Sequence, residues 1–335
     1  MTEVLLEKER KGPLLQMREL RVAFEDEEGF RVVALAGVDL VLDQGEVVCL
    51  VGESGCGKTL TALSIMGLLP SPPAVVESGS ILFSGKDLLR LGEEEMRQIR
   101  GKEISMVFQE PMTSLNPVFK VGEQIAEVMM VHEGSHPKEA KEKAAELLEA
   151  VGIGDPRRMM EAYPHQLSGG QRQRVMIAMA LACGPKLLIA DEPTTALDVT
   201  VQAQILHLFA RLMAERNMGL LYITHDLSVV AQIAKRAVVM YAGLVVEEGP
   251  VREIFRNPAH PYTVGLMNSI AALARKGQAL RSIPGSVPDP SSRPEGCPFH
   301  PRCSLGKDVC SRENPPMCHL GDNHWARCPV VQGSW

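Results

Sequence analysis

Short runs rich in β-branched residues alternate with longer segments of helical periodicity from Leu14 to about Phe255. Strands that alternate with helices in this way are typical of an α/β domain whose sheet is largely parallel. We predict buried strands at four places, Val47 to Val51, Leu187 to Ala190, Leu220 to Thr224 and Arg236 to Tyr241.

The strand pattern stops between about Pro111 and Leu167. Two helical patterns occupy this stretch, Val121 to His132 and Pro137 to Val151, the second beginning at a proline and closed by Gly152. We therefore expect a first domain of residues 1–255 that contains an inserted helical subdomain at about residues 111–167.

Proline becomes frequent after Phe255 and the periodicity weakens. A helix is expected from Pro261 to Ala274, and the stretch IPGSVPDPSSRPEG that follows is typical of an extended loop. Residues 256–335 are therefore predicted to form a separate C-terminal appendage.

Composition excludes several classes of protein. With 335 residues, 45% of them apolar, the chain can build a substantial core. A net charge of -6 gives no attraction to nucleic-acid phosphates, so no nucleic-acid partner is expected. The longest aliphatic stretch, Val175 to Cys183, is about half of the ~20 apolar residues that a membrane-spanning helix needs. The N-terminus lacks the long apolar segment of a secretory signal, so we expect the chain to stay in the cytoplasm.

The strongest local motif is GESGCGKT, Gly52 to Thr59, which lies between a predicted buried strand and a predicted helix. Glycines allow backbone N–H groups to surround a phosphate at the start of a helix, and Lys58 adds a positive charge. Thr59 can then bind Mg²⁺. The alternative is a glycine turn without function, which the strand and helix on either side make improbable.

A nucleoside triphosphate also needs a second carboxylate for Mg²⁺ and a group that positions water. Asp191 and Glu192 follow the predicted strand Leu187 to Ala190, so they are expected at its C-terminal end. Asp191 can support Mg²⁺ and Glu192 can orient the attacking water. Acids after a strand are often only helix caps, but the phosphate-binding motif upstream favours the catalytic interpretation.

A second helix start with anion-binding character occurs at LSGGQ, Leu167 to Gln171, where Ser168 can cap a long apolar helix and donate to a phosphate. One nucleotide should not need two helix starts so far apart in the sequence.

These motifs, together with Gln109, Ala196-Leu197-Asp198 and His225, occur in the order found in ATP-binding-cassette (ABC) ATPases, which the chain resembles from about Leu14 to Pro250. The resemblance implies the P-loop NTPase fold of the ABC type. It also implies a head-to-tail pair, in which LSGGQ of one subunit closes on ATP held by the other. That arrangement explains the two helix starts.

The same resemblance implies roles for single residues. Gln109 would sense magnesium and the membrane partner, His225 would contact the γ-phosphate, and Asp198 would contact the other subunit. Phe24 would stack on adenine, although a core role for Phe24 is an equal alternative because Phe30 lies nearby. The implied nucleotide-binding residues are Phe24, Gly52, Glu53, Ser54, Gly55, Cys56, Gly57, Lys58, Thr59, Leu60, Ser168, Gly169, Gly170 and Gln171.

Three further segments, FQEPMTSLNP, NPAHPYT and IPGSVPD followed by GCPFHPRC, resemble the ATPases of oligopeptide and dipeptide permeases. That branch also includes nickel, glutathione and opine importers, which remain alternatives to a peptide importer. The resemblance implies two transmembrane permease subunits and an extracytoplasmic substrate-binding protein. The chain would then lie on the cytoplasmic side of the inner membrane as a homodimer, or as a heterodimer with a paralogous ATPase.

Five of the eight cysteines crowd the last forty residues, with the spacing Cys297-x5-Cys303-x6-Cys310-x7-Cys318-x9-Cys328. In a reducing cytosol this density favours a soft-metal site, but the spacing matches neither the usual zinc pairs nor the compact ferredoxin motif. Members of the peptide-permease branch with such a tail carry a [4Fe–4S] cluster. The resemblance implies Cys297, Cys303, Cys310 and Cys328 as ligands and leaves Cys318 spare. Alternatives are reduced structural cysteines, or a zinc site that His300, His319 or His324 could join.

The expected cycle is closure of two subunits on two Mg·ATP, which pulls on the membrane helices, followed by hydrolysis that resets the pair. Lys58, Gln109, Glu192 and His225 are the predicted catalytic residues. Two rival functions are a soluble cassette in DNA repair or translation, and a redox or iron sensor centred on the tail. The first usually requires a coiled-coil insertion or two cassettes in one chain, and the sequence has neither.

Overall fold

The computed structural model of the chain describes residues 12–109, 114–195, 197–269 and 283–328. Its main sheet has eight strands in the order β11-β12-β10-β9-β3-β8-β7-β6. The strands are β3 (Val47–Val51), β6 (Ile104–Val107), β7 (Leu187–Asp191), β8 (Gly219–Thr224), β9 (Arg236–Tyr241), β10 (Leu244–Pro250), β11 (Cys318–Gly321) and β12 (His324–Ala326). The five from β9 to β6 are parallel, and the other three are antiparallel additions at the β9 edge. The predicted largely parallel sheet and its four strands are confirmed.

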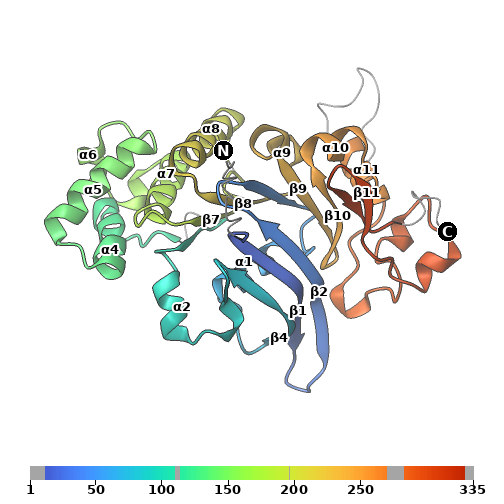
Figure 1. Cartoon of the computed structure of the whole chain (residues 1–335). Coiled ribbons are helices and arrows are strands. Elements are labelled where there is room, and N and C mark those ends of the chain that lie inside the picture. The colour runs from blue at the N-terminus through green and yellow to red at the C-terminus, as the bar shows by residue number, and fades with distance from the viewer. Residues whose placement is uncertain (1–11, 110–113, 196, 270–282, 329–335) are drawn as a thin grey trace, which may run out of the picture.

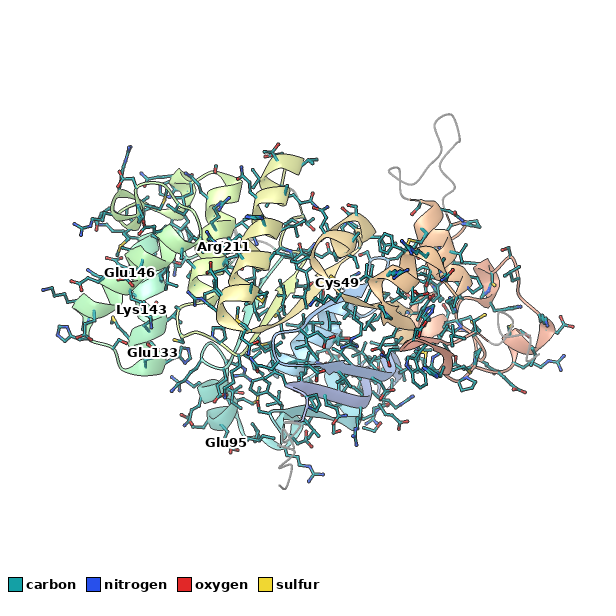
Figure 2. All side chains as sticks on the ribbon, turned by 45° about the horizontal axis from the view of Figure 1, so that its top comes forward. Cys49, Glu95, Glu133, Lys143, Glu146 and Arg211 are labelled. Carbon is teal, nitrogen blue, oxygen red and sulfur yellow. The ribbon has the colours of Figure 1, made fainter. Side chains whose placement is uncertain are left out.

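Side chains of the central strand β3 alternate between two cores. Val48 and Leu50 pack with α1 (Lys58–Met66), whereas Cys49 and Val51 lie in a second core with the helices on the opposite face. Cys49 is completely buried, at the centre of the molecule in Figure 2. The helices of the second core include α7 (Gly169–Ala180), α8 (Val199–Arg216) and α9 (Leu227–Ile233).

A second, four-stranded antiparallel sheet was not predicted. It has the order β2-β1-β4-β5, with β1 (Leu15–Glu25), β2 (Arg31–Leu42), β4 (Ala74–Phe83) and β5 (Lys86–Asp87). Its buried face packs on α1 and on the main sheet, so that α1 contributes to a core shared by both sheets. The short helix α2 (Glu93–Ile99) follows it, after the 3-10 turn Leu88–Arg90.

The stretch predicted to form a helical subdomain, as far as it is described, lies at one end of the molecule (Figure 1). It contains α4 (Val121–Glu133), α5 (Pro137–Ala150) and the unpredicted α6 (Pro156–Met160). An ion pair of 3.4 Å between Glu133 and Lys143 joins α4 to α5 (Figure 2). Helix α4 ends at Gly134, whose backbone has the left-handed conformation, and α5 begins at Pro137. The chain therefore reverses direction between the two helices.

The C-terminal segment lies at the other end of the molecule (Figure 1). It contains α10 (Val251–Arg256), α11 (Pro261–Asn268) and the 3-10 turns Pro290–Ser292, His300–Arg302 and Asp308–Ser311. The predicted helix from Pro261 is confirmed as far as Asn268, and its expected end lies outside the described residues.

This segment is joined to the main sheet, because β12 pairs with β10 and thereby extends it. The buried Glu247 of β10 strengthens the connection. It accepts hydrogen bonds from the backbone N–H groups of Ala259 and His260, at 2.8 and 2.7 Å, and lies 2.7 Å from Nε2 of His324. Division of the chain at residue 255 stays a prediction. No helix within the described ranges has the length and apolar character needed to cross a membrane.

Candidate functional site

The glycine loop turns around the side chain of Lys58 at the start of α1. Nζ of Lys58 donates to the carbonyl oxygens of Gly52 and Glu53 at 2.8 and 3.0 Å. Gly57 has φ 106°, and a side chain there would approach Leu35 to 2.7 Å, so this position requires glycine. Backbone N–H groups at the start of a helix, next to a buried ammonium group, form a site for phosphate.

A cavity of about 940 Å³ opens above this loop. Most of the predicted nucleotide residues line it, and so does Phe24 at the end of β1, which favours the adenine-stacking role over the core alternative. The predicted residues in its wall are Phe24, Glu53, Ser54, Gly55, Gly57, Lys58, Thr59, Leu60, Gln109, Glu192 and His225. Cys56 lies beneath the loop instead, fully buried, with Sγ 3.9 Å from Nζ of Lys58, and burial raises the pKa of its thiol.

Four side chains surround the carboxylate of Glu192, three of them from distant parts of the chain. Its Oε2 lies 3.1 Å from Nδ1 of His225 and accepts from Nε2 of Gln109 at 3.3 Å. Thr195 donates to the same oxygen at 3.1 Å, and Nζ of Lys58 lies 3.9 Å from Oε1. All four predicted catalytic residues therefore meet at one point.

The carboxylate of Asp191, at the end of β7, fits a cation. It is buried, and its Oδ1 has no hydrogen-bond partner among the described residues. Burial raises the pKa of Asp191, while a hydrogen bond from Thr59 lowers it. A buried carboxylate oxygen without a partner, next to a hydroxyl, is a donor set that suits Mg²⁺.

Ser168 caps α7 as predicted. Its Oγ accepts from the backbone N–H of Gln171 at 3.3 Å, and Oε1 of Gln171 accepts from the N–H of Ser168 at 2.9 Å. Among the described residues, Ser168, Gly169, Gly170 and Gln171 are not in the wall of the cavity. The chain thus presents two separate helix starts that suit anions.

The predicted cluster ligands lie next to one another in the tail. The backbone N–H of Cys297 donates to the carbonyl of Cys310 at 2.8 Å. Burial raises the pKa of the Cys297 thiol to about 11, and the charges of Cys310 and Cys303 add to the increase. Burial likewise raises the pKa of Cys303, with contributions from Cys328 and Cys310. Within the part of the chain that is described, however, no three His, Cys, Asp or Glu side chains are placed to hold one metal ion.

Two of the three histidines considered for zinc have other contacts. His324 is buried against Glu247, and the His319 ring lies 4.4 Å from the ring of Trp325. Both contacts weaken the zinc alternative.

Sequence reasoning missed three residues at the site. Thr195 bonds to Glu192, the hydroxyl of Tyr262 accepts from the backbone N–H of Glu53 at 2.8 Å, and Arg302 binds the Glu53 carboxylate. Thr195 carries no signal of its own in the sequence. Tyr262 and Arg302 lie in the motifs NPAHPYT and GCPFHPRC, which identified a branch but predicted no contact with the phosphate loop.

Comparison with known proteins agrees with this geometry. Residues 35–195 match the family described as ABC transporter, and residues 246–310 match the one described as oligopeptide/dipeptide transporter, C-terminal region. The oligopeptide transport ATP-binding protein OppD of Bacillus subtilis (strain 168) is 51% identical over 315 residues, covering 94% of this chain and 88% of OppD. The dipeptide transport ATP-binding protein DppD of the same organism is 50% identical over 315 residues, covering 94% of each chain.

A solved structure has the same fold. The dimeric bacterial ABC transporter cassette MJ0796 superimposes with a TM-score of 0.63 at 29% identity, covering 71% of this chain and 99% of its own. The predicted fold class is therefore confirmed. With the glycine loop, the acidic strand end and the LSGGQ helix in place, the chain belongs to the ABC transporter family, as an ATP-hydrolysing cassette of the branch that carries the oligopeptide/dipeptide transporter C-terminal region.

Proposed function

We propose that this chain is the nucleotide-binding subunit of an importer of dipeptides or oligopeptides. The observation that carries the proposal is the meeting of Lys58, Gln109, Glu192 and His225 around one cavity in a chain that also has the peptide-transporter C-terminal region. The relatives OppD and DppD are named for oligopeptide and dipeptide transport, which supports a peptide over nickel, glutathione or an opine.

Each residue of the cavity has a proposed role. The glycine loop and Lys58 hold the β- and γ-phosphates, and Phe24 stacks on the adenine. Glu192 orients the attacking water, since its carboxylate is held by His225 and Gln109. His225 also reaches the γ-phosphate, where it stabilises the charge that develops during transfer.

Magnesium would be held by Thr59 and Asp191, with Gln109 near it. The ion supplies charge neutralisation for the phosphates when it is bound. The raised pKa of Asp191 and its partnerless buried oxygen support this assignment, because a cation would offset the cost of a buried negative charge.

Pairing with a second cassette is proposed from the position of Ser168. Its helix start lies outside the cavity of its own chain, so its donors are available to ATP bound by a partner. The structural relative MJ0796 is described as a dimer, and also as a dimer after hydrolysis with ADP and Pi bound. The partner would be a second copy or a paralogous ATPase.

A surface near the cavity is proposed to dock the membrane subunits. A hollow of about 580 Å³ lies between the helical subdomain and the main sheet, lined by Met66, Leu68, Met106, Phe108, Val128, Met176 and Met179 among others. Val118 and Phe119, which precede α4, are 72% and 52% exposed. Apolar side chains arranged in this way are suited to contact a helix on the cytoplasmic face of a membrane protein.

The tail is proposed to hold a [4Fe–4S] cluster on Cys297, Cys303, Cys310 and Cys328. Support comes from the proximity of these thiols, since burial and the charges of neighbouring cysteines raise the pKa values of Cys297 and Cys303. A cluster would also stabilise a segment with few apolar residues.

Purification of the chain with its native partners tests the proposal. We expect two membrane proteins and a binding protein from the same complex, and the binding protein should bind di- or oligopeptides in a calorimetric titration. A binding protein that takes nickel, glutathione or an opine instead would contradict the peptide assignment while leaving the ATPase intact.

A further inference from the structure

Arg302 connects the cysteine-rich tail with the phosphate loop. It lies in the 3-10 turn His300–Arg302, between Cys297 and Cys303. Its Nη1 and Nη2 donate to Oε2 and Oε1 of Glu53 at 2.7 and 3.1 Å. This bidentate pairing fixes both the position and the orientation of the carboxylate.

The arginine itself is held rigidly. Its side chain is only 5% exposed, and Nε donates to the carbonyl of Pro284 at 2.8 Å. Nη2 also lies within bonding distance of the carbonyls of Ile283 and Gly285, and Nη1 of the hydroxyl of Tyr241. Because its own conformation is fixed, Arg302 can transmit a fixed position to Glu53.

Glu53 is a member of the loop that binds phosphate, and its backbone is restrained as well. Its N–H donates to the hydroxyl of Tyr262 at 2.8 Å, and its carbonyl accepts from Lys58 at 3.0 Å. The loop is therefore restrained by hydrogen bonds from its own Lys58, and by hydrogen bonds with Tyr262 and Arg302 of the C-terminal segment.

An aromatic cluster supports these contacts from below. The rings of Tyr241, Tyr262 and Phe299 lie 4.6 to 5.5 Å apart, and Cys297 and Cys303 pack against the same cluster. Residues of the C-terminal segment also line the nucleotide cavity itself, namely Leu266, Ser269, Ile283 and Pro290. The tail thus forms part of the wall around the nucleotide.

We propose that Arg302 is a positioning residue for ATP, which acts by holding Glu53 so that the phosphate loop keeps its nucleotide-binding conformation. The proposal rests on the assignment of this loop to ATP. A purely structural alternative is that Arg302 only fastens the tail to the cassette. The two differ in outcome, since a positioning role changes nucleotide affinity through Glu53, whereas a fastening role changes stability alone.

Arg327 offers a matched control in the same tail. It is a half-buried arginine that donates to the carbonyls of Val245 and Pro315, both at 3.0 Å, and so joins the tail to β10. Loss of either arginine removes side-chain hydrogen bonds that hold the tail, but of the two only Arg302 bonds to Glu53.

The test is a calorimetric titration of Mg·AMP-PNP into the full-length chain. We expect R302A to raise the Kd about tenfold, R302K to raise it severalfold because a lysine cannot pair with both oxygens, and R327A to leave it within about twofold. In the E53Q background, R302A should add little. The ATP turnover of R302A at saturating nucleotide should stay within about threefold of the wild type, with the loss in KM.

The proposal is overturned if R302A binds like the wild type, if R327A weakens binding equally, or if R302A has its full effect in E53Q. If R302A does not fold, R302K and E53Q provide the same comparison. K58A tests the underlying assignment separately. If K58A binds Mg·AMP-PNP as tightly as the wild type, the assignment of this loop to ATP and the present proposal are overturned together. If K58A loses affinity for Mg·AMP-PNP and R302A does not, this proposal alone is overturned.

Discussion

The carboxylate of Glu192 and the imidazole of His225 lie within 3.1 Å of each other, although 33 positions separate them, because β7 and β8 are parallel neighbours that end at the same edge. Glu192 also has φ 44°, in the left-handed region that is unfavourable for its residue type. Unfavourable backbone of this kind is often found at functional sites. The sheet thus places an acid and a base where a single phosphate can reach both.

Replacement of Asp191 by asparagine should increase stability and abolish the magnesium site. Because burial raises the pKa of Asp191, folding disfavours its ionised form, and D191N should raise the free energy of unfolding. Thermal unfolding with and without Mg·ATP measures both effects. Stabilisation by Mg·ATP should disappear in D191N and persist in D155N, which changes an exposed cap of α6. Undiminished stabilisation of D191N would remove this residue from the site.

Mixing two inactive variants tests the pairing of copies. K58A damages the phosphate loop and S168R the cap of α7, so each variant alone should hydrolyse almost no ATP. In a mixed head-to-tail pair, one site combines an intact Lys58 with an intact Ser168. A random mixture should then recover about a quarter of the wild-type rate. A mixture no more active than its components would contradict a homodimer and leave the paralogous ATPase as partner.

Metal content separates the proposed ligands from the spare cysteine. Protein purified anaerobically should contain about four iron atoms per chain and absorb broadly in the visible range. C318S should keep the iron, while C303S should lose it, since Cys303 influences the pKa of Cys297 and is itself influenced by Cys310 and Cys328. Zinc in place of iron, or iron retained by C303S, would contradict the assignment. Comparison of the ATPase rate before and after removal of the cluster tests the alternative that the chain is a redox or iron sensor. An unchanged rate would contradict that alternative.

His260 should make the stability depend on pH. Burial lowers its pKa from 6.5 to about 4, so the folded protein holds this histidine neutral while the unfolded chain takes up a proton. Stability is therefore fully present above about pH 6.5 and falls as the pH approaches 4, by about 3 kcal/mol in total.

The variant H260N isolates this effect, because asparagine can also accept from the N–H of Tyr262 at the start of α11 but does not titrate. Urea denaturation at pH 7 and pH 5 should show a smaller decrease for H260N than for the wild type. Equal decreases would exclude His260 as the source.

The four neighbouring strands β9, β3, β8 and β7 of the main sheet could be predicted because their residues are almost all buried. The segments VVCLV of β3 and AVVMY of β9, which follows Arg236, are unbroken apolar runs of strand length. The antiparallel sheet gave a weaker pattern, since β1 has register shifts near Leu20 and Val22 that interrupt the alternation of apolar residues. The tail strand β12 has only three residues and depends on β10 for pairing, which no local pattern reveals.

The residues of the candidate site also divide into those that a local motif predicts and those that only the fold brings together. The glycine loop, Asp191 with Glu192, and Ser168 belong to short motifs whose chemistry is local, so the sequence predicted them. The contact between Glu53 and Arg302 joins residues 249 positions apart. Each residue lies in a motif that the sequence shows, but neither motif predicts a contact with the other, and only the fold brings the tail to the loop.

Peptide uptake by cells that carry E192Q in place of the wild-type chain tests the central claim most directly. Glutamine keeps the shape of the side chain but cannot polarise water, so ATP turnover should fall at least about 100-fold while Mg·AMP-PNP binding is retained. We predict that uptake of a labelled tripeptide is lost in E192Q. It should be unchanged in E215Q, whose glutamate is exposed on α8. Undiminished uptake by E192Q, at equal protein level, would contradict the account.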